Sequence, residues 1–183
     1  MEETTVTVIG MIIAVIIMLV VPLILIADRS DDIAQLVVQT AAEEFVDDVI
    51  KTGEITSSRY QRFIDALQSS GNTYEIDMEV KILDENTAKR ITDENPKETG
   101  NNTYYSMFTN QIESRIGISS NAIAYNNTGK LVLKQGDGIS ITVKNSSATL
   151  SQTLKSFYYN AIGEEIHIIS ATASGTVAIN GAT

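Results

Sequence analysis

The stretch "IIMLVVPLILIADRSDD", residues 16–32, decides how this chain folds. It carries an apolar run through Pro22 and then passes directly into three aspartates, Asp28, Asp31 and Asp32. The run extends back to residue 8, so residues 8–27 contain no charge. As an α-helix rising about 1.5 Å per residue, this segment would span about 30 Å, which is the thickness of a bilayer's hydrocarbon core. The sequence therefore predicts a membrane-length helix.

The chain beyond the aspartates continues the same helix. Apolar residues recur there every three or four positions, and no proline or glycine occurs before Gly53. We expect one helical unit over residues 1–52, apolar on every face in segment 8–27 and amphipathic in segment 28–52. Pro22 lacks an N–H and crowds the preceding turn, so it predicts a kink or a short unwound stretch. The stripe expected to pack consists of Ala34, Val38, Ala41, Phe45 and Val49.

Residues 53–183 read as a small head of the α+β class. "SSRYQRFIDAL" predicts a short amphipathic helix with Ser57 or Ser58 as its N-cap. "TYEIDMEVKIL" alternates apolar and polar residues, as a half-buried strand does, with Tyr74, Ile76, Met78, Val80 and Ile82 facing inward. The polar residues 84–102 predict a long exposed loop.

Further elements complete a sheet of four or five antiparallel strands. The spacing of Tyr105, Phe108, Ile112 and Ile116 predicts a second helix, and residues 130–144 a hairpin that turns at residues 136–138. A third helix is expected after residue 148, burying Leu150, Leu154 and Phe157. The apolar alternation around Gly175 predicts either another hairpin or one long bent strand.

Composition excludes several classes of function. The chain has 13 basic and 23 acidic residues, a net charge of −10 that repels nucleic acid. It has no cysteine, so disulfides and thiolate metal sites are excluded. The acidic head carries Asn-X-Ser/Thr sequences at Asn101, Asn126 and Asn145, which favour an extracytoplasmic location at the cell surface, anchored in the membrane.

Catalytic signatures are absent from the sequence. The single histidine, His167, lies in "EEIHIIS" and is interpreted as a strand residue, with no nucleophile elbow, Walker loop or dinucleotide fingerprint nearby. We therefore expect no enzyme, no cofactor and no catalytic or metal-binding residues.

The layout resembles a type IV pilin. A long N-terminal helix, apolar first and amphipathic second, contains a proline about twenty residues in and precedes a small α/β head, and the "VPLILI…D" exit also resembles the bacterial TadE-like pseudopilins of tight-adherence systems. This resemblance covers the first 50 residues or so. It implies an adhesive surface filament with helices in its core, and it singles out Gly10 and Pro22. If Gly10 ends a leader, the mature chain starts near Met11; otherwise it starts at Met1.

Charged residues on the amphipathic segment are candidates for contacts between subunits. Glu43 and Asp47, and Glu44 and Asp48, are like-charged pairs four residues apart, which destabilise an isolated helix slightly. Two interpretations remain open: a solvated face, or carboxylates that meet cations of the same or a neighbouring subunit. A divalent cation site is a third alternative. The candidate cations are Lys51, Arg59, Arg62, Lys89 and Arg90.

Two functions compete at this point. The first is the structural subunit of a pilus-like filament, a helical homo-oligomer that resides in the membrane before assembly and displays its heads outward. The second is a single-pass membrane-anchored binding or secretion-machinery protein that does not polymerise. Leu36, Val46 and Ile50 lie off the main stripe or at its edge. Because a polymer needs contacts on more than one helix face, these three residues favour the first function.

Overall fold

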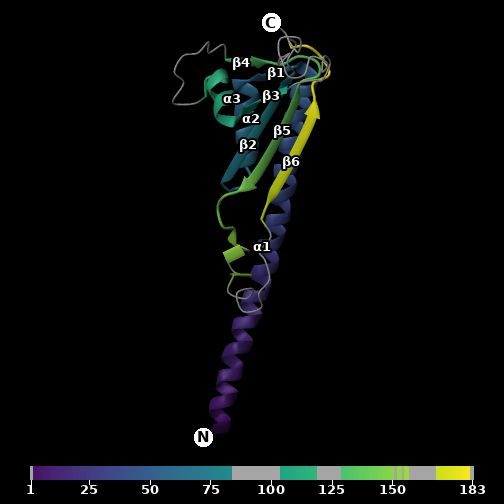
Figure 1. Ribbon diagram of the computed structural model, residues 1–183. Helices are drawn as coiled ribbons and strands as arrows, with labels where there is room; N and C mark the ends of the chain where they lie inside the picture. Colours follow the sequence, from purple (N-terminus) through teal and green to yellow (C-terminus); the bar gives the residue numbers. More distant parts are fainter. Residues whose placement is uncertain are drawn as a thin grey trace, which may run out of the picture.

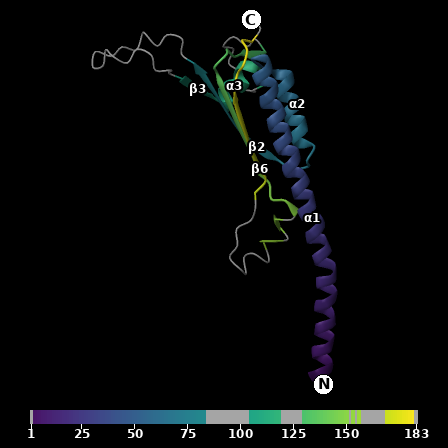
Figure 2. The ribbon, with the colours of Figure 1, turned by 90° about the vertical axis from the view of Figure 1, so that its right-hand side faces the viewer.

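The computed structural model describes residues 2–83, 104–118, 129–150, 152–153, 155–156 and 168–181. Helix α1, Glu2–Thr52, runs the length of the molecule (Figure 1). Its N-terminal half projects away from the head, and its C-terminal half lies against the head's sheet (Figures 1 and 2). The predicted long helix followed by an α+β head is confirmed.

Pro22 does not interrupt this helix. The backbone is α-helical on both sides of the proline, and Figure 2 shows the helix bending gently while remaining unbroken. The expected unwound stretch is therefore wrong. A proline removes one hydrogen bond and pushes on one turn, and a gentle bend accommodates both changes in a long helix.

The head is built on a four-stranded antiparallel sheet. Its strand order is β3-β2-β5-β6, with β2 at Tyr74–Leu83, β3 at Tyr104–Phe108, β5 at Gly138–Asn145 and β6 at Ser170–Thr176. A second, two-stranded sheet pairs β1, Glu54–Thr56, with β4, Lys130–Val132. Helices α2, Ser57–Gln68, and α3, Thr109–Ile116, complete the head.

The core lies between the inner face of the large sheet and helices α1 and α2. Met78 and Val80 of β2 are buried, as the alternation predicted, beside Ile139, Ile141 and Val143 of β5. The helices pack on this face because the outer residues of β2 are charged and stay in water. At the lower end of β6, the Gln35 side chain donates to the Ser170 carbonyl at 2.7 Å and accepts from its N–H at 3.0 Å.

The N-cap of α2 lies one residue before Ser57, the first of the two expected caps. Thr56, in extended conformation, accepts a hydrogen bond from the Arg59 N–H through its hydroxyl, so Thr56 is the cap and Ser57 the first helical residue. The apolar spacing predicts a buried face of Tyr60, Phe63, Ile64 and Leu67. The prediction is confirmed for Tyr60, Phe63 and Leu67, and Ile64 is partly buried.

Residues 104–108 form a strand and not the first turn of a helix. Tyr105 and Phe108 belong to β3, which pairs with β2, and α3 starts only at Thr109. Ile112 and Ile116 are buried on α3, so the predicted helix is present but shorter. The edge of β2 offers backbone hydrogen bonds to this segment. These favour a strand more strongly than the spacing of two aromatic residues favours a helix.

The predicted hairpin over residues 130–144 is also wrong. β4 and β5 lie in different sheets, because β4 pairs with β1 while β5 lies between β2 and β6. The chain does turn at Gly136, whose φ is 97°. The turn is held by the buried Asp137, whose two carboxylate oxygens accept from the Leu83 N–H at 2.9 Å and the Lys134 N–H at 2.7 Å.

Other expectations have mixed outcomes. Gly175 lies within the single strand β6, so the alternative of a hairpin there is wrong. Leu150 is 65% exposed and does not belong to a buried helical face. The loop over residues 84–102, with Lys89, Arg90 and Asn101, lies outside the described residues, as do Asn126, Leu154, Phe157 and His167.

The C-terminal end of α1 is locked by a close approach of two glycines. Gly53 has a φ of 67°, and its carbonyl accepts from the Leu133 N–H at 2.7 Å. The Gly181 N–H donates to the Leu133 carbonyl at 2.9 Å, and the Ala178 N–H donates to the Ile50 carbonyl at 3.2 Å. The bond from Ala178 satisfies one of the last carbonyls of α1, and the three bonds together bring the C-terminal segment against Gly53.

Gly53→Ala should lower the free energy of unfolding of the detergent-solubilised protein by roughly 2–3 kcal/mol. A Cβ at residue 53 would meet the backbone of Ile179 and Gly181, which cannot rotate away, and alanine is strained at this φ. Gly71→Ala is the matched control, because Gly71 has a φ of 80° and open space around it. Equal losses in chemical denaturation of the two variants would contradict the role given to the close approach.

Candidate functional site

The apolar half of α1 has no cover within the described chain. No residue from 3 to 26 is buried. Most large apolar side chains there are exposed, each by at least 43% of its surface. By length and composition α1 is the one helix of the described residues able to cross a membrane. Gly10 lies in this half, and a Cβ at Gly10 would meet nothing within 4 Å. This surface needs lipid or other helices around it.

The amphipathic half of α1 uses its stripe to hold its own head. All five predicted stripe residues are buried: Ala34, Val38, Ala41, Phe45 and Val49. The Phe45 ring stacks on Phe63 of α2 with centroids 4.9 Å apart and meets Tyr60 edge-on at 6.2 Å. The predicted stripe is therefore an intramolecular interface between α1 and the head.

Two of the three residues expected to reach other helix faces are also occupied. Val46 is buried, and Ile50 packs on the core beside Gly175 of β6. Leu36 alone remains turned outward, at 67% exposed, and Ile33 at 64% joins it one turn below. Sequence reasoning missed Ile33, although its spacing of three from Leu36 was visible.

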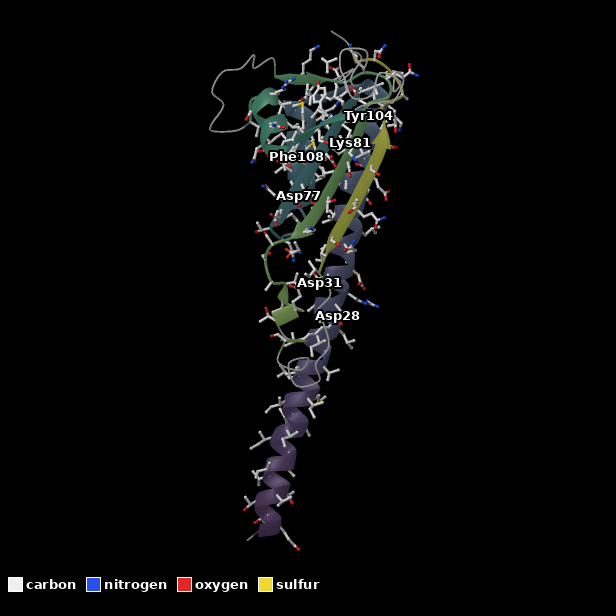
Figure 3. The ribbon with its side chains drawn as sticks, in the orientation of Figure 1. Asp28, Asp31, Asp77, Lys81, Tyr104 and Phe108 are labelled. Carbon is white, nitrogen blue, oxygen red and sulfur yellow. The ribbon has the colours of Figure 1, made fainter. Side chains whose placement is uncertain are left out.

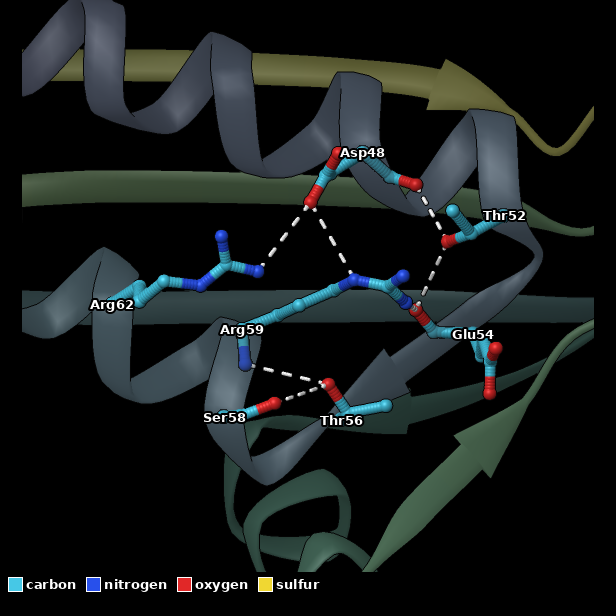
Figure 4. Close-up of polar contacts among 7 residues, drawn as sticks. All are labelled: Asp48, Thr52, Glu54, Thr56, Ser58, Arg59 and Arg62. Carbon is cyan, nitrogen blue, oxygen red and sulfur yellow. Dashed lines mark hydrogen bonds and ion pairs between the residues drawn. The ribbon is translucent and has the colours of Figure 1, made fainter.

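The predicted charged residues lie along α1 and at the start of α2. Asp48 Oδ2 is 3.5 Å from Arg59 Nε and 3.9 Å from Arg62 Nη2, so one carboxylate links the two helices (Figure 4). An Arg59 Nη1 atom also donates to the Glu54 carbonyl at 3.0 Å, which ties α2 to β1 (Figure 4). Both arginines thus have partners inside the chain.

The other three carboxylates form no salt bridge with the head among the described residues. Asp47 pairs with Lys51 on the next turn at 3.2 Å. Glu43 accepts from the Gln39 side chain at 3.0 Å, and Glu44 is exposed without a salt bridge among the described residues. No group of three or more His, Cys, Asp or Glu side chains in the described parts of the chain is placed to hold a metal ion.

The aspartates that follow the apolar run bind a descending segment of the head. Asp28 Oδ1 is 2.6 Å from Lys155 Nζ, and the Thr149 hydroxyl donates to Asp31 Oδ2 at 2.8 Å. Figure 3 shows both aspartates on the stretch of α1 below the sheet. Sequence reasoning found these residues but not their partners, which lie more than a hundred positions away along the chain.

The outer face of the sheet carries the head's exposed side chains. Asp77 and Lys81 of β2 lie on this face with Tyr104 and Phe108 of β3 (Figure 3), and the aromatic pair is 45% and 60% exposed. Glu79 accepts from the Ser106 hydroxyl at 2.6 Å.

Comparison of the chain with protein-family models, with curated proteins and with solved structures found no match. The assignment of function therefore depends on the geometry of α1 and the head alone.

Phe45→Ala should lower the free energy of unfolding by about 3–5 kcal/mol, because it empties the aromatic contact between α1 and α2. Asp48→Asn should lower it by less than about 1 kcal/mol, because the Asp48 side chain is 51% exposed and solvent screens its ion pairs. Chemical denaturation of both variants in detergent compares them. A larger loss for Asp48→Asn would mean that charge, not packing, seats the head on α1.

Tyr60 makes the stability of the head depend on pH in the alkaline range. Burial, with the hydrogen bond that its hydroxyl donates to Glu113 at 2.7 Å, raises the pKa of Tyr60 well above its usual range. A raised pKa favours the neutral phenol in the folded state, so this contribution to stability is present below pH about 10 and is lost above it. Thermal unfolding should show a shallower decline above pH 10 in Tyr60→Phe than in the wild type; equal slopes would contradict this.

Proposed function

We propose that this chain is the structural subunit of a pilus-like surface filament, resident in a membrane before assembly, with α1 in the filament core and the head displayed outward. The proposal includes no catalytic role and no resident cofactor. It places the head outside the cytoplasm, as the acidic composition and the candidate glycosylation sequences favour.

The observation that carries the proposal is the division of α1 into a covered and an uncovered half. Residues 34–49 bury one stripe in the head, while residues 8–26 are apolar on every side and bury nothing. Such a surface is stable in lipid before assembly and among neighbouring helices afterwards. A rod with an apolar end and a seated head supports stacking of many copies around a shared core.

Ile33 and Leu36 favour the filament over a solitary anchor. Both lie above the Asp28–Asp32 band, outside the membrane-length segment, and both face away from their own head. A lone anchor would leave these two side chains in water at a cost of roughly 1.5–3 kcal/mol each relative to burial. A neighbouring helix would cover them.

A single-pass membrane-anchored protein of a secretion or assembly machine is the second candidate. Its support is that the head is complete without a partner, since α1 already covers the inner face of the sheet. In this case α1 would serve as anchor and core at once.

Cells that express the chain with its assembly machinery should shed filaments that contain it as the repeating unit, visible by negative-stain electron microscopy of sheared material. The double variant Ile33→Ser and Leu36→Ser should lose filaments while its head stays folded, because both residues are exposed in the monomer. Leu150→Ser is the control, since Leu150 is equally exposed but belongs to the head segment whose Thr149 contacts Asp31, outside the face formed by Ile33 and Leu36. A monodisperse wild-type monomer in detergent, with no filaments on cells, would instead support the anchor.

A further inference from the structure

Helix α1 carries a continuous exposed stripe on the side opposite its head. At about 100° per residue, the members of this stripe lie within about 60° of the direction of Arg29. All of them are exposed, and we call them the Arg29 stripe: Met18, Pro22, Leu25, Ile26, Arg29, Asp32, Ile33, Leu36, Thr40, Glu43, Glu44 and Asp47. The stripe is apolar at the bottom, carries Arg29 with Asp32 at its edge in the middle, and ends in acids.

Arg29 is the only basic residue among the first 50. The described parts of the chain give it no salt bridge, whereas the nearby Asp28 and Asp31 are engaged with Lys155 and Thr149. A guanidinium at the edge of an apolar surface is costly to bury unless a carboxylate pairs with it. Asp32, three residues further along the stripe, forms no salt bridge with Arg29 in the described structure, so an acid supplied by a partner at the level of Arg29 would stabilise the covered stripe.

We propose that the partner is the α1 helix of a second copy, parallel and shifted along its axis, whose Glu43 and Glu44 pair with Arg29. Copies inserted in one membrane run parallel, so an antiparallel pairing is not available to them. Two parallel copies at the same level would set Arg29 against Arg29 and acid against acid. Like charges brought together in this way oppose the unshifted pair.

An axial shift of 14 or 15 residues removes that repulsion and produces complementarity. This is the separation of Glu43 and Glu44 from Arg29, and it corresponds to about 21–23 Å of helix. With this shift, the copy that supplies the acids has its Ile33 and Leu36 level with residues 18–22 of the copy that supplies Arg29. Met18, which is 81% exposed, and Pro22 lie on the stripe at that level. One shift thus pairs Arg29 of one copy with the acids of the other and covers Ile33 and Leu36 of the copy that supplies those acids.

This inference rests on the proposed filament and adds the contact that sets the register of neighbouring helices. Arg29→Glu should reduce filament yield at least about tenfold, because it places three charges of one sign at the contact. Adding Glu43→Arg and Glu44→Arg to this variant should restore filaments. Lys144→Glu is the matched control, since it makes the same charge change at an exposed position of β5 in the head. Circular dichroism in detergent checks that each variant is folded.

A disulfide test does not depend on charge. The chain has no cysteine, so Arg29→Cys with Glu44→Cys introduces the only two thiols. They lie about 22 Å apart on one helix and cannot join within a copy. Oxidised filaments should give a ladder of covalent multimers, whereas Arg29→Cys with Gln39→Cys should not, because residue 39 lies on a different face and at a different level.

The outcomes separate the two proposals. Wild-type filaments with unchanged yield in Arg29→Glu, or with no ladder from the 29 and 44 thiols, would overturn the register and leave the filament standing. No filaments and no ladder from any form of the chain would overturn both.

Discussion

The packing of the amphipathic half of α1 into the head is the interaction on which the rest of the structure depends. Val38 and Val49 are fully buried and Phe45 is 4% exposed, and burial of each such side chain contributes roughly 1.5–3 kcal/mol. Helix α1 covers the inner face of the four-stranded sheet together with α2, and α3 adds Ile112 and Ile116 to the same core. Without α1 the core of the head would therefore be incomplete. The helix is a structural layer of the domain and not a tether attached to it.

Because α1 is both a layer of the head and the apolar segment, the orientation of the head is fixed relative to the apolar segment. One unbroken helix connects them, and Gln35, Asp28 and Asp31 add polar contacts to the head at its lower end. A flexible linker would let the head swing relative to the membrane. A helix of 51 residues, clamped along its upper half and at Asp28, instead fixes the direction in which each head points. Ordered display of many heads needs this kind of constraint.

Much of the fold was predictable where the signal was local. The long helix, its stripe, α2 and β2 follow from periodicities that a few neighbouring residues carry. The errors occur where distant segments decide. Residues 104–108 become a strand because β2 has an open edge, and β4 leaves the expected hairpin because β1 and Gly53 offer it backbone partners. The partners of Asp28 and Asp31 were hidden for the same reason. The spacing of Ile33 and Leu36 could be read from the sequence. That these two side chains remain exposed could not, because it depends on which face of α1 the head covers.

The face of α1 that packs on the head and the opposite, exposed face carry their charges differently. On the head side, the acids have fixed partners: Asp48 meets two arginines, and Asp28 meets Lys155. On the far side, Glu43 and Glu44 have no cation of their own chain among the described residues, and like charges four residues apart cost an isolated helix a few tenths of a kcal/mol. In the proposed filament, acids concentrated above one arginine would make equal alignment of two parallel helices unfavourable. The same charges would thus oppose the unshifted pair that apolar contact alone would allow.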